Sequence, residues 1–234
     1  MQPGAVIDQR FELERSVAAG GMGQIWRARD RVTGRPVAIK VMLGDDATAH
    51  ARFGREAALL ADLRHPGVVE YVAHGSYAGA PYLAMEWLDG VDLAARSRAS
   101  RIDAFATVEM RPTQPGVGGF DGGDDDGAPP VGLPVAEVVV LARRLASALG
   151  EVHGRGVVHR DLKPENVFLL DGDLTRAKLI DFGVARGAEV AALTADGVVI
   201  GTPHYMAPEQ VRGDVVTAAT DVWGLGAVLY ELFA

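Results

Sequence analysis

One short stretch constrains this chain more than any other. Residues 159–166 read His-Arg-Asp-Leu-Lys-Pro-Glu-Asn, and Asp-Phe-Gly follows at 181–183. Apolar runs leave the first motif and enter the second, with Asp-Gly-Asp at 171–173 between them. This pattern predicts a loop, a strand, a tight turn and a returning strand. Such a hairpin brings Asn166 and Asp181 to the same end, where an amide oxygen and a carboxylate suit Mg²⁺, a cation that shares hard oxygen ligands with substrate phosphates.

Both motifs closely resemble the catalytic loop and the magnesium motif of the eukaryotic-like protein kinases. The resemblance implies that Asp161 faces an incoming hydroxyl group and acts as the catalytic base, and that Lys163 lies near the transferred phosphate. It implies that Asn166 and Asp181 are the metal ligands. Arg160 is typical of kinases regulated by phosphorylation of the activation loop, because a phosphothreonine offers its guanidinium a bidentate partner. The alternative is that local carbonyl groups satisfy Arg160.

Composition bounds the remaining possibilities. The chain has 234 residues, of which 48% are hydrophobic, and this is enough for one two-lobed domain or two small ones. No cysteine is present, so disulfides and thiolate metal sites are excluded. Neither a secretory signal nor an uninterrupted membrane-spanning run is found, which predicts a cytoplasmic protein. The net charge of −8 argues weakly against nucleic acid as the main partner.

The first part of the chain, residues 11–42, reads as strands interrupted at 17–23 by a glycine-rich turn. A plain hairpin is one interpretation of that turn, and a loop whose backbone N–H groups approach phosphates is the other. The apolar strand that ends at Lys40 favours the second, because it matches the phosphate-binding lysine of the kinase family. The family's loop begins with an additional glycine where this chain has Ala18.

A helix is expected over residues 47–63 and two strands over 68–74 and 82–87. On the resemblance, Glu56 in that helix pairs with Lys40, although most helical glutamates are only solvated. The second strand resembles the one that enters the kinase hinge.

There the resemblance implies that Met85 is the gatekeeper, that Glu86 and Leu88 offer backbone groups to adenine, and that Asp92 lies near the ribose. By itself, Met85 would more often be a core residue. The complete set of ATP-binding residues implied by the resemblance is Val17, Gly20, Gly21, Gly23, Ile25, Ala38, Lys40, Glu56, Met85, Glu86, Leu88, Asp92 and Phe168.

The composition changes between Asp103 and Gly132, where prolines, glycines and an aspartate cluster predict a flexible insertion without a packed core. A solvated spacer is the simplest interpretation. A long helix should follow, starting after Pro134 and ending near His153.

The segment after Asp181 ends in Gly-Thr-Pro-His-Tyr-Met-Ala-Pro-Glu at 201–209, which resembles the kinase activation segment. The resemblance implies that Thr202 contributes to catalysis, that Thr194 is an autophosphorylation site and that Glu209 forms a buried ion pair. In the family, further helices supply the arginine for that pair, so we expect a C-lobe truncated at this point. The final helix should then leave one apolar face uncovered, made of Trp223, Leu225, Val228, Leu229 and Leu232.

The fold class predicted is α+β: a two-lobed kinase fold, with a β-rich N-lobe and hinge at 1–88 and a mainly helical, incomplete C-lobe at 89–234. The resemblance to bacterial Hanks-type kinases, supported by Lys163 and Thr202, implies transfer of the ATP γ-phosphate to serine or threonine hydroxyls of proteins with Mg²⁺ present. It also implies a homodimer in which one copy phosphorylates the other. The alternatives are an ATP-binding scaffold with little activity, a small-molecule phosphotransferase of related fold, and a two-lobed interaction domain without activity.

Overall fold

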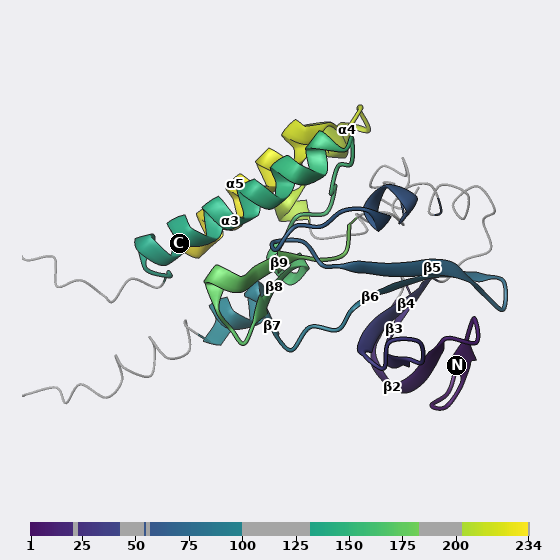
Figure 1. The fold of residues 1–234 in the computed structure, drawn as a ribbon. Coiled ribbons are helices and arrows are strands. Elements are labelled where there is room, and N and C mark those ends of the chain that lie inside the picture. Colours follow the sequence, from purple (N-terminus) through teal and green to yellow (C-terminus); the bar gives the residue numbers. More distant parts are fainter. Residues whose placement is uncertain (21–22, 43–53, 55–56, 100–131, 183–202, 234) are drawn as a thin grey trace, which may run out of the picture.

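The computed structural model describes residues 1–20, 23–42, 54, 57–99, 132–182 and 203–233. An N-terminal sheet of six strands lies at the lower right of Figure 1, and two long helices lie side by side at the upper left. A small sheet of three strands lies between them (Figure 1). This arrangement is the two-lobed α+β fold that the sequence predicts.

The first sheet is antiparallel, and its strands follow the order β1-β2-β3-β4-β6-β5. Their bounds are β1 Val6–Ile7, β2 Phe11–Gly20, β3 Gly23–Asp30, β4 Pro36–Met42, β5 Tyr71–Tyr77 and β6 Ala80–Glu86. Alternate side chains are buried in β3, in β4 and at the start of β2 (Phe11 and Leu13), as expected for strands with one face on a core. Phe11, Trp26, Ile39 and Tyr82 form the centre of that core.

Two strand predictions need correction. The interruption expected at 17–23 is shorter, because β2 stays paired with β3 as far as Gly20. The strand expected at 68–74 starts at Tyr71 instead and runs to Tyr77. The strand starts later because Val69 contacts the other lobe: its amide donates to the Leu179 carbonyl of β9 at 2.9 Å.

The small sheet has the order β7-β8-β9 and consists of β7 Gly90–Asp92, β8 Val167–Leu170 and β9 Ala177–Leu179. The predicted β8–β9 hairpin is therefore present, but its turn is longer than expected. It includes a 3₁₀ helix, η2 (Leu174–Arg176), which is capped by the Asp173 carboxylate accepting from the Thr175 amide at 2.8 Å.

The helical layer is formed by α3 (Val135–Gly154) and α5 (Ala218–Phe233), with the short helices η1 (Pro164–Asn166), η4 (Pro203–Tyr205) and α4 (Pro208–Arg212). Residues 57–61 and 93–99 are also helical. The buried stripe of α3 is Val138, Leu141, Leu145, Ala148, Leu149 and Val152.

The prediction of an uncovered face on the final helix is wrong for most of its residues. Val228 and Leu232 are completely buried, and Leu225 and Leu229 pack partly against the same core. Only Trp223 remains half exposed, at 51%. The reason is that α3 covers this side of α5, as the ribbon in Figure 1 shows.

Most of the predicted insertion lies outside the described residues, but its last residue does not. The Leu133 amide donates to the Leu232 carbonyl at 2.9 Å, and a Cβ at Gly132 would lie 2.5 Å from the same oxygen. Gly132 is therefore packed against the end of α5 and does not belong to a spacer. In the described part of the chain, no helix is long and apolar enough to cross a membrane.

Candidate active site

A buried aspartate accepts hydrogen bonds from the backbone of the loop that precedes β8. Asp221, at the start of α5, is 1% exposed and accepts hydrogen bonds from the backbone amides of His159 and Arg160, both at 2.8 Å. The His153 side chain of α3 lies 2.7 Å from the same carboxylate. The sequence analysis missed Asp221 as a site residue, although one signal was available: an acidic residue in the first turn of a mainly apolar helix.

The His159 side chain connects this loop to the residues that follow β9. Its Nε2 lies 3.0 Å from the Ile180 carbonyl oxygen, and its ring stacks at a tilt on Phe182 with a centroid distance of 4.7 Å. Burial is the main cause that lowers the pKa of His159, so the ring is neutral and Nε2–H can donate to that carbonyl. The loop before β8 and the motif after β9 are thereby joined.

Two residues of this site have a strained backbone conformation. Arg160 and Asp181 have φ angles of 66° and 54°, in the left-handed region that non-glycine residues rarely adopt. Such conformations persist where the surroundings enforce them. Here the Asp221 carboxylate holds the Arg160 amide, and the Gln210 side chain donates to the Arg160 carbonyl at 2.7 Å.

Three polar side chains converge in the loop itself. The Asn166 amide nitrogen donates to the Asp161 carboxylate at 3.0 Å and to its backbone carbonyl at 2.7 Å. The Lys163 ammonium lies 3.5 Å from the same carboxylate. The Asp161 and Lys163 side chains are each 19% exposed, so the carboxylate is oriented from two sides and still reachable.

The charged centre is completed from the other lobe. Lys40, on β4, places its ammonium 2.8 Å from the Asp181 carboxylate, and both side chains are mostly buried. The predicted partner of Lys40, Glu56, lies outside the described residues, so that pairing stays a prediction. The Lys40–Asp181 contact brings the two lobes together at the motif that the sequence singled out.

The donors around this centre fit the magnesium ion that the family implies. The β8–β9 pairing, with the Ile180 amide donating to the Asn166 carbonyl at 3.0 Å, places Asn166 and Asp181 at the same end of the hairpin. Because the Asn166 amide nitrogen is used by Asp161, its side-chain oxygen is the atom left for a metal. The described residues contain no cluster of three acidic or histidine side chains that could hold a metal ion by themselves.

The residues predicted to hold the nucleotide lie on neighbouring strands. Strand register pairs Ile25 with Lys40 and Ala38 with Met85, and β7 pairs Asp92 with Phe168. The Asp92 carboxylate also caps the helix at 93–99 by accepting from the Ala95 amide at 2.7 Å, a structural role that the sequence did not reveal.

Other predicted nucleotide contacts have their own constraints. Gly23 has a φ of 142°, and a Cβ there would lie 2.2 Å from the Val41 carbonyl, so only glycine fits this turn. The Glu86 carboxylate pairs with Lys178 and accepts from the Glu70 amide. The Glu86 backbone amide in turn donates to the Glu70 carbonyl at 2.9 Å, so this N–H group is already engaged within the chain. The predicted nucleotide contacts of Gly20 and Leu88 stay predictions. Val17, near the end of β2, is 45% exposed.

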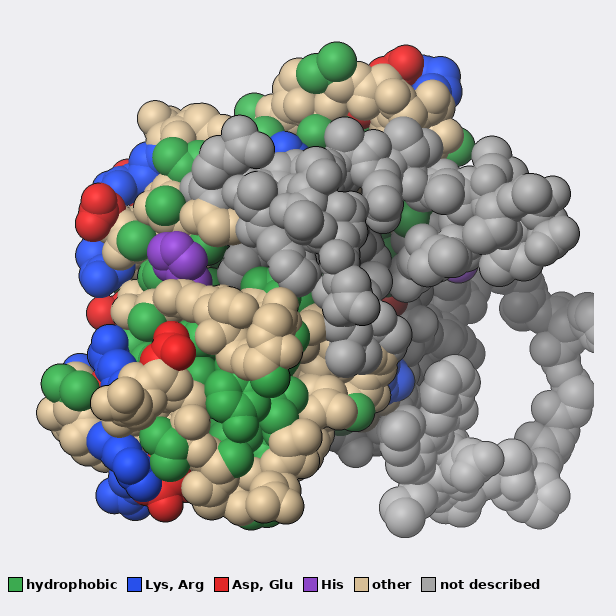
Figure 2. Space-filling view, turned by 90° about the vertical axis from the view of Figure 1, so that its right-hand side faces the viewer, with side chains coloured by type: hydrophobic (Ala, Val, Ile, Leu, Met, Phe, Trp, Pro, Cys, Tyr) green, Lys and Arg blue, Asp and Glu red, His purple; other side chains and the backbone are tan. Residues whose placement is uncertain are grey.

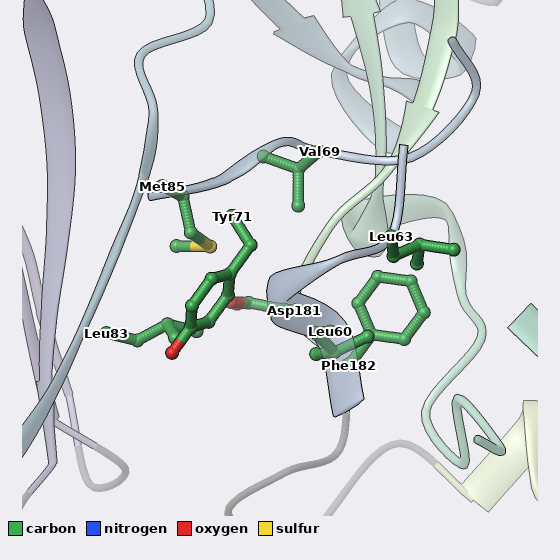
Figure 3. A pocket seen from close by; sticks show the side chains of 8 residues that line it. All are labelled: Leu60, Leu63, Val69, Tyr71, Leu83, Met85, Asp181 and Phe182. Atoms are coloured by element: carbon green, nitrogen blue, oxygen red, sulfur yellow. The ribbon is translucent and has the colours of Figure 1, made fainter. Parts of the chain in front are cut away.

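An apolar pocket lies behind Met85. Figure 3 shows Tyr71 in the middle of its lining, with Met85 and Leu83 on one side and Phe182 on the other. The remaining lining residues are Leu60, Leu63, Val69 and Asp181. Among the described residues nothing pairs with the buried Tyr71 hydroxyl, whose pKa is raised by burial. The sequence analysis did not identify Tyr71.

The predicted regulatory residues are only partly described. Thr194, the predicted autophosphorylation site, lies outside the described residues, as do Gly21 of the predicted nucleotide site and Thr202, which was predicted to contribute to catalysis. Glu209 is half-buried on α4, and its carboxylate accepts from the Thr220 hydroxyl at 2.6 Å, which lowers its pKa. Its partner in this structure is therefore a hydroxyl group of α5.

The chain belongs to the protein kinase family, since the model for the protein kinase domain matches residues 11–234. Curated relatives agree with the bacterial serine/threonine type. The DNA damage-responsive serine/threonine-protein kinase RqkA of Deinococcus radiodurans is 37% identical over 99% of this chain and 31% of that protein. The serine/threonine-protein kinase PknB of Mycobacterium leprae is 34% identical over 97% of this chain and 32% of that protein.

The chain thus spans about a third of the length of these curated relatives. Among solved structures, a mutant form of the PknI kinase domain of Mycobacterium tuberculosis matches with a TM-score of 0.71 and 27% identity. That match covers 100% of this chain and 77% of the PknI chain. The fold, the motifs and the relatives define the same class of protein.

Proposed function

We propose that this chain transfers the γ-phosphate of ATP to serine or threonine hydroxyls of protein substrates. The observation that carries the proposal is the carboxylate of Asp161, oriented by Asn166 and Lys163 beside the Lys40–Asp181 ion pair. A phosphoryl group passes through a loose transition state with its charge spread over the oxygens, so catalysis is mostly positioning and electrostatic stabilisation.

Each charged residue then has a distinct task. Asp161 accepts a hydrogen bond from the hydroxyl group of the substrate and thereby orients the hydroxyl oxygen towards the phosphorus. It then takes the proton of that hydroxyl group. Lys163 neutralises charge on the migrating phosphoryl group. Lys40 gives up its ion pair with Asp181 and binds the remaining phosphates. Asn166 and Asp181 would hold Mg²⁺, which when bound shields the phosphate charges.

The first prediction separates catalysis from nucleotide binding. Asp161→Asn should lower the rate of phosphate transfer at least about a hundredfold, because the amide cannot accept the proton, and leave ATP affinity nearly unchanged. Lys40→Met should lower both. The measurements are transfer of labelled phosphate to a generic protein acceptor and calorimetric ATP binding.

The matched control is Asp171→Asn, the same acid-to-amide change in the exposed turn of the β8–β9 hairpin. It should leave the transfer rate unchanged. Undiminished transfer by Asp161→Asn would refute the assignment.

We further propose that Thr194 is autophosphorylated and that Arg160 binds the resulting phosphate. Thr194 is the one threonine between Asp181 and Gly201, and a phosphate would give the guanidinium a bidentate anion. Mass spectrometry after incubation with ATP should find phosphate on Thr194, and Thr194→Ala should show a lower transfer rate. Phosphate found elsewhere only, or full activity of Thr194→Ala, would contradict this.

The same experiment addresses the proposed homodimer. Phosphorylation between two copies is second order in protein, so its initial rate per molecule should rise with protein concentration. A rate per molecule that is independent of concentration would mean phosphorylation within one copy. Because the reaction requires ATP, we propose a cytoplasmic location for this domain.

A further inference from the structure

Two arginines face each other across strands β2 and β3. Arg15 and Arg27 are direct partners in the antiparallel register, so their side chains leave the sheet on the same face. Like charges in directly opposite positions destabilise a sheet. A pair of this kind requires something between or beside the two guanidinium groups that attracts both.

Trp87 meets this requirement. The guanidinium carbons of Arg15 and Arg27 lie 5.6 Å and 5.4 Å from the centroid of the Trp87 ring, within the usual range of about 6 Å for a cation–π contact. Arg27 also forms an ion pair with Glu14. The Trp87 ring is itself oriented, because its indole N–H donates to the Asp89 carboxylate at 2.8 Å.

The contact joins two parts of the proposed nucleotide site. Trp87 follows Glu86 at the end of β6, in the hinge between the lobes. Arg27 lies two residues from Ile25 and therefore on the same face of β3, whereas Trp26 and Ala28 are buried on the other face. The β2–β3 hairpin that ends in the glycine turn is thus attached to the hinge on the face that carries Ile25.

We infer that Trp87 is a positioning residue, which holds the β2–β3 hairpin over the nucleotide through Arg15 and Arg27. This inference rests on the proposed function, because it assumes that ATP binds between this hairpin and the hinge. Trp87 acts through the hairpin and has no role at the reacting atoms. Preorganising a loop in its bound conformation increases affinity mainly by lowering the cost of ordering it.

The first experiment separates nucleotide binding from turnover. Trp87→Leu removes the ring, and we expect the KM for ATP to rise about fivefold with kcat changed less than about twofold. Trp87→Phe keeps an aromatic face and should recover most of the affinity. Trp223→Leu, which removes the half-exposed tryptophan of α5, is the matched control and should leave the KM unchanged.

The second experiment needs no nucleotide. Hydrogen exchange of the β2 and β3 amides should be faster in Trp87→Leu than in the native chain. Arg15→Gln and Arg27→Gln should also accelerate the exchange. When either is combined with Trp87→Leu, the effect on exchange should be smaller than the sum of the two single effects, because both substitutions break the same arginine–tryptophan contact. Glu14→Gln controls for the ion pair of Arg27.

The two experiments fail differently. If the native chain neither binds nor uses ATP, the proposed function is wrong, and hydrogen exchange still tests the contact. Unchanged exchange in Trp87→Leu overturns the inference. So does faster exchange without a change in KM, because the contact then would not position the nucleotide. Equal KM increases in Trp87→Leu and Trp87→Phe also overturn it.

Discussion

Asp30 shows how much one buried charge depends on its partners. It is 1% exposed and accepts two hydrogen bonds from Arg10, at 2.9 Å and 2.8 Å. The Val32 amide and the Thr33 hydroxyl donate to the same carboxylate. With all its acceptor positions engaged, this carboxylate ties the start of β2 to the turn after β3.

The pKa of Asp30 is well below its ordinary value, first because of the hydrogen bonds from Arg10. The unfolded chain therefore takes up a proton here at a higher pH than the folded chain does. The stabilisation is fully present above the ordinary aspartate pKa of about 4 and is lost as pH falls below it towards the folded-state pKa.

We predict that Asp30→Asn lowers the free energy of unfolding by about 1.5–3 kcal/mol at pH 7, because the charge-assisted hydrogen bonds from Arg10, whose side chain is 32% exposed, are lost. The difference from the native chain should shrink at pH 3.5, measured by urea denaturation at both values. Glu12→Gln is the control: Glu12 pairs with Arg31 at 3.1 Å on the exposed surface, and its loss should cost less than about 1 kcal/mol. An equal loss for Asp30→Asn at both pH values would contradict the linkage.

At the scale of elements, the packing at the edge of the N-terminal sheet requires a residue without a side chain, Gly75. Gly75 of β5 pairs with Tyr82 of β6, whose ring is 1% exposed and packs edge-on against Phe11. The Tyr82 hydroxyl donates to Asp8, next to β1. A Cβ at Gly75 would lie 2.8 Å from the Tyr82 ring and 2.7 Å from the Asp8 carboxylate.

Gly75→Ala should therefore destabilise the chain by about 1–3 kcal/mol through overpacking, even though alanine suits a strand at least as well as glycine does. Ser76→Ala, at the exposed neighbouring position of β5, is the control and should change stability by less than about 0.5 kcal/mol. Thermal unfolding of both variants tests this. Equal melting temperatures would show that Tyr82 moves aside without cost.

At the scale of the whole molecule, the lobes are joined by contacts that do not involve the catalytic loop. The Glu86–Lys178 ion pair links the hinge to β9, and the Leu179 amide donates to the Gly67 carbonyl at 2.8 Å. Arg144 of α3 adds a bond to the Pro66 carbonyl at 2.5 Å. On the coloured part of the face in Figure 2, Lys and Arg side chains (blue) lie among Asp and Glu side chains (red).

If residues 103–131 are a solvated spacer, a short Gly-Ser link in their place should leave ATP affinity within about twofold, because the cost of closing a loop varies slowly with its length. Gly132 must be kept, since it packs against α5. A second variant that also removes Gly132 and Leu133 should melt at a lower temperature. A large loss of ATP binding in the first variant would mean that the segment contacts the hinge.

The sequence by itself determined the family, the two-lobed α+β fold and the β8–β9 hairpin. These features are encoded by contiguous residues, in which each motif and its flanking apolar runs lie within one or two elements. The same reasoning located Asp161, Lys163, Asn166 and Asp181 in one loop and hairpin. Their roles remain predictions, as do those of the residues outside the described part.

Only the tertiary structure decided which distant residues support that centre. Asp221 lies about sixty residues from the loop it holds, and Trp87 meets two arginines from other strands. Val228 and Leu232, expected to be uncovered, are buried because α3 packs on them. The physical reason is common to all three: burial and partner choice depend on which surfaces the folded elements bring together, and a periodic pattern records only that a face is apolar, not what covers it.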